Sequence, residues 1–206
     1  MNNVDLKQVW LNSLPSAIND AEDEWNNIVS KYSGTGRHYH TMEHLQNMYK
    51  ELQEYYVDML PVATVLALMY HDFEYSALRS DNEKQSAVHS EKKLGEWNLP
   101  QELVQKVSLL IISTQSHRTD GGDEELKVFL DADMAVLGYD AATYAGYIAA
   151  VRKEFSIYPD FIYNKGRRDF VKKTLEGSRI FLTEYFFEKY EQQARINLQN
   201  ELNTLL

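Results

Sequence analysis

The sequence is poor in the residues that cross-link, interrupt or anchor a chain. None of its 206 residues is cysteine, four are proline and nine are glycine. The lack of cysteine excludes a disulfide framework and any metal site built on thiolates, so a metal would need histidine, carboxylate, backbone oxygen or water. No stretch approaches the roughly 20 apolar residues that span a bilayer, and the opening MNNVDLKQVW lacks the pattern of a signal peptide. We therefore expect a cytoplasmic protein with no membrane partner.

Positive charge is also scarce. The chain carries 21 Lys and Arg residues against 31 Asp and Glu residues, a net charge of −10. A surface for duplex nucleic acid needs clustered positive charge, so such a partner is not expected. Hydrophobic residues make up 44% of the chain, and its length is sufficient for one substantial core. With no repeat, low-complexity run or linker, the sequence predicts one domain over residues 1–206.

Hydrophobic residues recur mostly at helical spacing, which predicts an all-α fold. The predicted helices lie at residues 3–32 (as one helix or two), 41–57, 61–70, 82–97, from 100 onward, 124–137, 141–155 and 183–206. Thr41 suits an N-cap and Pro61 a first helical turn, and Asp81 or Asn82 is expected to cap the fourth of these segments. Gly121-Gly122 is expected to break the chain, and residues 159–166 to be irregular.

The pair His71-Asp72 follows an almost wholly apolar predicted helix. A carboxylate placed there is costly to bury unless a positive charge meets it. No Lys or Arg occurs between Glu51 and Leu78. A bound metal ion would supply the missing positive charge.

Other residues are suited to join this pair as ligands. His44 lies inside a predicted helix on the face of Met48, so it is preferred to His40. Asp133 shares an apolar stripe with Leu130, whereas Asp131 is predicted on a more polar face, so Asp133 is preferred and Asp131 stays open. Imidazole and carboxylate together suit Mn, Fe, Co, Ni or Zn, and Mg less well. The alternative for each residue is an ordinary hydrogen-bonded core position.

These residues resemble the HD superfamily of metal-dependent phosphohydrolases, in which a His, a His-Asp pair and a distant Asp lie on helices. Here the pattern is His44, His71-Asp72 and Asp133. The surrounding strings are similar to one subgroup of predicted HD phosphohydrolases: RHYHTMEHL at 37–45, YHDFEY at 70–75, NEKQSA at 82–87, TQSH at 114–117 and LDADMAVLG at 130–138.

The resemblance implies a single HD-type all-α domain with a core of about residues 37–140 and extra helices at both ends. It implies a divalent metal ion bound by the four residues of the pattern, and hydrolysis of a phosphoester or phosphoanhydride, nucleotides included, by metal-activated water. The partner would be a small phosphorylated substrate. Some HD relatives are di-iron oxygenases or domains that only bind ligands. Both remain alternatives here, as does a helical adaptor without metal, and the apolar last helix leaves a homo-oligomer open.

Further roles follow from the resemblance and from charge. Asp72 would accept a hydrogen bond from the attacking water, and His117 would protonate the leaving group, bind phosphate or bind a second metal. The string at residues 82–87 makes Glu83 a candidate catalytic residue and Asn82 a candidate substrate ligand, although both also suit helix capping. Positive side chains that could hold a phosphate are Arg37, Lys165 and Arg167. The alternative for the basic run at 165–173 is a solvated helix face.

Overall fold

The structure is a computed structural model that describes residues 4–119, 121 and 123–205. Within these residues the chain forms helices and no strand, so the fold is all-α as the hydrophobic spacing predicts. The elements are α1 (Leu6–Asn12), α2 (Ala21–Tyr32), α3 (Met42–Tyr56), α4 (Val62–Tyr70), α5 (Asn82–Glu96), α6 (Gln101–Ser113), α7 (Glu124–Met134), the short 3₁₀ helix η1 (Ala135–Gly138), α8 (Ala141–Glu154), α9 (Asp160–Glu176) and α10 (Glu184–Thr204).

Local sequence signals fix most helix starts. Oxygen-bearing side chains accept hydrogen bonds from first-turn N–H groups, which would otherwise lack a partner. The residues that do so are Asp5, Thr41, Asp123, Asp140 and Thr183. Pro61, Pro100 and Pro159 directly precede α4, α6 and α9. The helix starts expected at Thr41, Pro61, Pro100 and Thr183 are therefore confirmed.

Two expectations about the chain's course are wrong. Residues 159–166 are not irregular, because α9 begins at Asp160 and runs through Gly166. A lone glycine inside a helix costs only about 1 kcal/mol, which tertiary packing offsets. The helix expected at 124–137 ends at Met134 and continues as η1. The chain was expected to break at Gly121-Gly122, and Gly121 does lie between α6 and α7. Gly122 lies outside the described residues, as does the final residue of the last predicted helix, Leu206.

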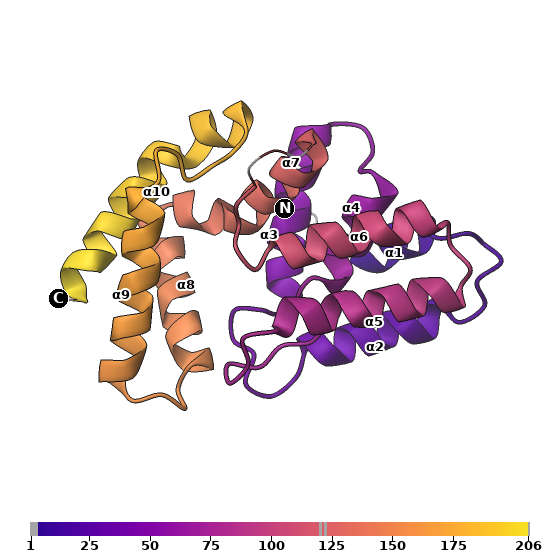
Figure 1. The fold of residues 1–206 in the computed structure, drawn as a ribbon, viewed down its shortest axis with the longest axis horizontal. Coiled ribbons are helices and arrows are strands. Elements are labelled where there is room, and N and C mark those ends of the chain that lie inside the picture. Colours follow the sequence, from indigo (N-terminus) through magenta and orange to yellow (C-terminus); the bar gives the residue numbers. More distant parts are fainter. Residues whose placement is uncertain (1–3, 120, 122, 206) are drawn as a thin grey trace.

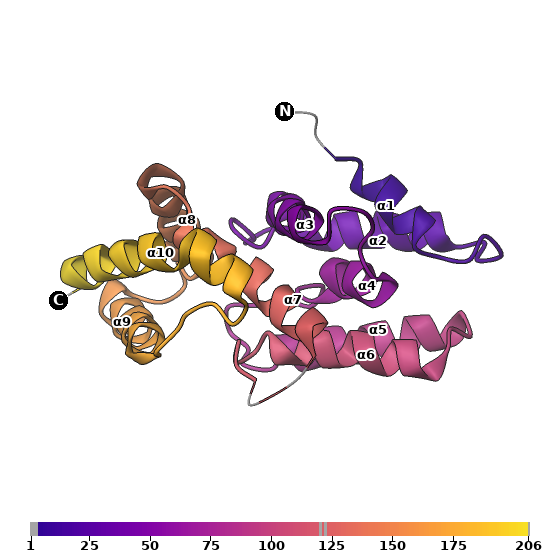
Figure 2. The same cartoon turned by 90° about the horizontal axis from the view of Figure 1, so that it is seen from above.

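The helices form two groups joined by α7 and η1 (Figures 1 and 2). The first group contains α1–α6, in which α6 packs against both α5 and α4. The second contains α8–α10, in which α10 packs along α9 and against η1. Gly138 permits the contact between η1 and α10, because a Cβ atom there would collide with Tyr190. In the described part of the chain, no helix is both long and apolar enough to cross a bilayer.

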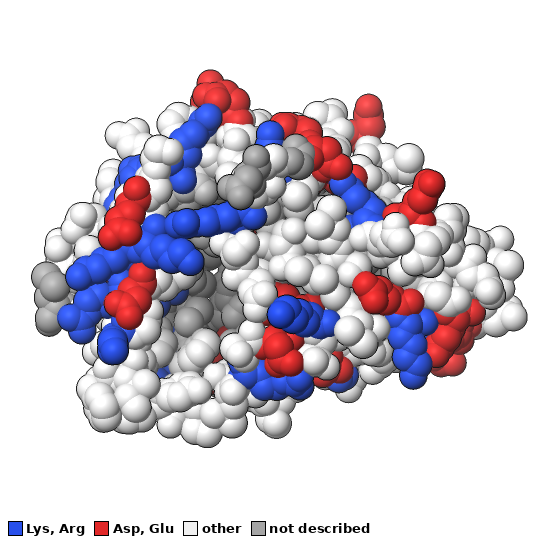
Figure 3. All heavy atoms as spheres, viewed as in Figure 1, with Lys and Arg blue, Asp and Glu red and all other residues white. Residues whose placement is uncertain are grey.

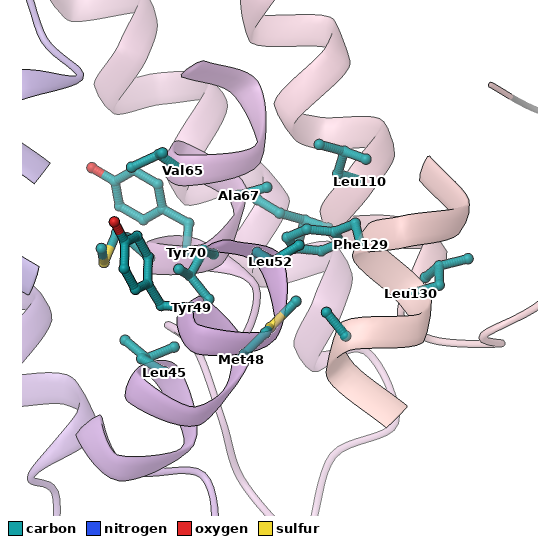
Figure 4. Close-up of a cluster of buried hydrophobic side chains, with 14 of the residues drawn as sticks. Leu45, Met48, Tyr49, Leu52, Val65, Ala67, Tyr70, Leu110, Phe129 and Leu130 are labelled. Atoms are coloured by element: carbon teal, nitrogen blue, oxygen red, sulfur yellow. The ribbon is translucent and has the colours of Figure 1, made fainter. Parts of the chain in front are cut away.

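Helix α4 lies at the centre of the first group. Every residue from Ala63 to Tyr70 is buried, as expected for a helix that is apolar nearly all round. Figure 4 shows Ala67 of α4 beside Leu52 of α3 and Phe129 of α7. Helices α3 and α7 also contact each other, and this contact closes the core. The end of α4 thus delivers the next residue, His71, into the interior, where it is 1% exposed.

Candidate metal centre

Three helices bring His44, His71 and Asp133 together. His44 lies in the first turn of α3, His71 caps α4, and Asp133 lies at the end of α7. The Nε2 atoms of the two histidines are 3.1 Å apart. Oδ1 of Asp133 lies 3.2 Å from Nε2 of His44 and 3.9 Å from Nε2 of His71. The three ligand atoms all lie within 4.8 Å of one another, a group that could hold a metal ion.

Asp72 lies against the two imidazoles of this group. Its Oδ2 atom is 3.1 Å from Nε2 of His71 and 3.7 Å from Nε2 of His44. The two adjacent residues can face one point because α4 has ended at Tyr70. Two donors at right angles around an ion with bonds of about 2.1 Å lie about 3.0 Å apart. The spacing of these donors therefore fits a shared ion.

The orientation of His71 also suits a ligand. Its Nδ1 atom lies 2.9 Å from the carbonyl oxygen of Leu68, one turn earlier in α4. Because Nδ1–H donates to that carbonyl, the lone pair of Nε2 is directed toward His44 and the carboxylates. Metal-binding histidines are commonly oriented by such a second hydrogen bond.

The electrostatics of the group favour a cation. Burial disfavours the charged form of His71, but the carboxylates of Asp72 and Asp133 outweigh it and raise its pKa to about 9. Burial would raise the pKa of Asp133, yet hydrogen bonds from His117 and His44 hold it well below its ordinary value. The pKa of Asp72 is also lowered against burial, through His71 and His40. The two carboxylates thus favour positive charge at the His71 imidazole.

Two further histidines lie at the edge of the group. Nε2 of His117 lies 2.8 Å from Oδ2 of Asp133, the oxygen turned away from the other imidazoles. The second is His40, whose Nδ1 atom lies 2.7 Å from Oε2 of Glu154. The Nε2 atom of His40 lies 4.0 Å from Oδ2 of Asp72. Of the two histidines left open by the sequence, His44 belongs to the group and His40 lies beside it.

Glu154 is a residue of this region that the sequence analysis missed. Its Oε1 atom accepts hydrogen bonds from the backbone N–H groups of His38, Tyr39 and His40, and its Oε2 atom accepts one from the Tyr75 hydroxyl. Burial would raise the pKa of Glu154, but His40 and the N–H donors lower it to about 2. It is the last residue of α8, more than 110 positions from the loop that it binds, so no local pattern could reveal it.

Pockets open beside the group. One of about 150 Å³ is lined by Asp72, Asp133, His40, His117 and Glu83 among others. Another of about 350 Å³ reaches His44 and shares Tyr39 and Tyr147 with the first. A small molecule could therefore reach the carboxylates and imidazoles from outside.

The candidates Glu83 and Asn82 differ in whether they line the pocket beside Asp72 and Asp133. Glu83 lines it, in the first turn of α5. Asn82 instead binds the preceding loop, since its side chain accepts from the N–H of Ser76 and donates to the carbonyl of the same residue. The structure thus brings Glu83, but not the amide of Asn82, to the wall of the pocket.

The predicted phosphate-binding cations do not line either of these pockets. Arg37 donates to the backbone carbonyls of His40, Asp72 and Phe73, and so braces the loops that carry the site. Arg167 is 8% exposed and forms two hydrogen bonds to Glu201. Lys165 is exposed on α9. Their binding of substrate stays a prediction.

The expected polar surroundings of Asp131 are wrong. Asp131 is only 1% exposed, because the start of α10 covers it. Its carboxylate accepts hydrogen bonds from the N–H groups of Leu182 and Thr183 and from the Thr183 hydroxyl. Asp131 therefore holds the start of α10, and Asp133 faces the imidazoles.

Comparisons of the chain with protein-family models, with curated proteins and with solved structures found no match. The findings therefore establish an all-α protein with a His-His-Asp group that could bind a metal ion.

Proposed function

We propose that this chain is a metal-dependent phosphohydrolase of the HD type, acting on a phosphoester or phosphoanhydride of a small molecule, nucleotides included. The observation that supports the proposal is the convergence of His44, His71, Asp72 and Asp133, from three separate parts of the sequence, with donor atoms 3.1–3.9 Å apart in the measured pairs. These are the four residues of the HD pattern, in its order.

The four residues would hold a divalent ion such as Mn, Fe, Co, Ni, Zn or Mg. A bound ion would supply Lewis-acid chemistry, lowering the pKa of a water molecule and stabilising negative charge on a phosphoryl group. The carboxylates of Asp72 and Asp133 line the adjacent pocket, where their oxygens can accept a hydrogen bond from an attacking water. They also repel a phosphate that arrives without a cation, so substrate binding depends on the ion.

Other side chains of the pocket can move or hold protons. His117 lines it, and the contact of Nε2 with Asp133 leaves Nδ1 as the nitrogen that can donate to a leaving group. Glu83 lies on the same wall and can accept a proton. A correctly placed acid or base of this kind contributes roughly 10²–10⁴ in rate.

The test is hydrolysis of a panel of phosphoesters, nucleotides and phosphoanhydrides by purified protein supplied with each divalent metal in turn. We expect turnover that requires a metal, that stops with a chelator and that is lost in His71→Ala. His89→Ala is the matched control, because His89 is a half-buried histidine paired with Glu24 outside the group. Tight binding without turnover would instead support a ligand-binding domain, and oxygen-dependent turnover with bound iron would support an oxygenase.

A further inference from the structure

A third pocket, of about 440 Å³, is also lined by His117. His117, Met134 and Phe170 line both this pocket and the one beside Asp72 and Asp133. Its remaining walls are the loop that follows α6, at residues 115–118, the last turn of α9 and the connection from α9 to α10, together within residues 173–182. A group bound here would touch side chains that also line the pocket beside the candidate metal centre.

The charge of this pocket is opposite to that of the whole chain. Arg118, Lys173 and Arg179 line it with a single acidic residue, Glu176, although the protein has a net charge of −10. Figure 3 shows Lys and Arg side chains gathered on the side of the molecule where α9 and α10 lie. Such a local concentration of positive charge attracts anions.

The three cations differ in how they are engaged. Arg179 stacks on Phe187, with 3.8 Å from its guanidinium carbon to the ring centroid, and pairs with exposed Glu184 at 2.8 Å. Among the residues that the structure describes, the guanidinium of Arg118 makes one hydrogen bond, a long 3.4 Å contact to the carbonyl of Lys173. The ammonium group of Lys173 forms no ion pair with any residue that the structure describes. These side chains can donate hydrogen bonds to an incoming ligand.

We infer that this basic pocket binds a second phosphate group of the substrate, while the reacting phosphate occupies the pocket beside Asp72 and Asp133. Guanidinium and ammonium donors are the side chains that recognise phosphate, and the shared wall of His117 places the two pockets next to each other. The substrate class is thus narrowed to small molecules with two phosphate groups. The identity of the reacting group as a phosphate rests on the proposed function. The binding of phosphate in the basic pocket does not rest on it.

The first test measures the binding of inorganic phosphate to protein stripped of metal with EDTA, by titration calorimetry. We expect Lys173→Ala to weaken binding by roughly tenfold and Lys173→Glu to weaken it further, because a charge-assisted hydrogen bond is lost and then replaced by repulsion. Lys92→Ala is the control, since it removes one exposed positive charge from the remote end of α5. Binding that is equal in wild type and in both Lys173 variants, or equally weakened by Lys92→Ala, would overturn the inference.

The second test separates a phosphate of the substrate from free phosphate. The metal-loaded protein is assayed with two substrates that share the same leaving group, one with a second phosphate and one without. We expect Lys173→Ala to raise KM roughly tenfold for the first substrate only. If KM changes equally for both or for neither, while inorganic phosphate still depends on Lys173, the pocket binds free phosphate and the narrowing of the substrate class is wrong. If no substrate is hydrolysed by wild type, the proposed function fails, and calorimetry still decides on the pocket.

Discussion

The Nε2 atoms of His44 and His71 face each other at 3.1 Å. The other nitrogen of His71 donates to the carbonyl of Leu68, so its lone pair faces His44 across this short distance. Two lone pairs cannot be neighbours at such a distance without a positive charge or a proton between them. The raised pKa of His71, about 9 despite burial, shows that Asp72 and Asp133 provide the matching negative charge. The pair of imidazoles, with Asp133, therefore forms a group that could hold a cation.

Replacement of His71 by alanine should abolish most metal binding. The change removes one of the imidazoles, and we expect the loss of affinity to exceed the roughly 10–100-fold that changes outside the ligand shell cost. The measurement is metal content by elemental analysis, with calorimetric titration of the stripped protein. His89→Ala should retain wild-type metal content. Wild-type protein that neither carries metal nor takes it up would contradict the assignment.

Asp131 and Asp133 are close in sequence and should respond differently to removal. Asp133→Ala should lose metal and activity while the fold persists, because its carboxylate faces the imidazoles and His117. Asp131→Ala should lower the free energy of unfolding by roughly 2–3 kcal/mol, since three donors at the start of α10 lose their acceptor. Urea unfolding and metal analysis of both variants test this. The opposite assignment of the two effects would show that Asp131 is the ligand.

Local chemistry explains why much of the fold could be predicted. Thr41 and Thr183 cap helices through their own side chains, and proline precedes α4 and α6. The starts of these helices are therefore determined by a few neighbouring residues. The helix over residues 160–166 could not be predicted locally, because glycine is typical of a chain break and only packing of α9 against α10 decides that the helix continues through Gly166.

The residues of the candidate site also differ in whether the sequence alone could reveal them. His71-Asp72 could be found because polar residues directly after an apolar helix stand out in the sequence. His44 could be found because it shares a predicted helix face with Met48 and matches the HD pattern. The burial of Asp131 could not be found, because α10 covers it from more than 50 positions away. Glu154 was invisible for the same reason. Pairings that depend on tertiary contact between remote segments have no local periodicity to reveal them.

Glu154 should make stability depend on pH. Its pKa falls from an ordinary 4.5 to about 2 in the folded protein, a shift worth roughly 3 kcal/mol. Because the folded-state pKa is lowered, this stabilisation is present above pH 4.5 and is lost as the pH falls toward 2. Glu154→Gln should therefore be less stable than wild type by about that amount at pH 7, and the difference should shrink to less than half by about pH 3. Urea titrations at both pH values measure it. A difference that does not change with pH would mean that charge is not what Glu154 contributes.

The contacts of Arg167 in the structure change the result that we expect from its removal. The sequence alone suggests a phosphate ligand, whose removal would raise KM. In the structure its guanidinium makes hydrogen bonds of 2.7 and 3.0 Å to the buried carboxylate of Glu201 and one of 3.0 Å to the Tyr147 hydroxyl. Arg167→Ala leaves that carboxylate buried without its partner, so we expect a loss of roughly 3–5 kcal/mol in the free energy of unfolding.

A second change separates the two roles of Arg167. In the double variant Arg167→Met with Glu201→Gln, no charge is left buried, and the amide oxygen of the new side chain can still accept from the Tyr144 hydroxyl. We expect it to recover at least half of the lost stability, since removing both charges avoids the penalty of one unpaired ion. KM for a phosphate substrate should then equal that of wild type, because Arg167 lines neither pocket at the candidate metal centre. A raised KM in this stable double variant would return Arg167 to the role of a phosphate ligand.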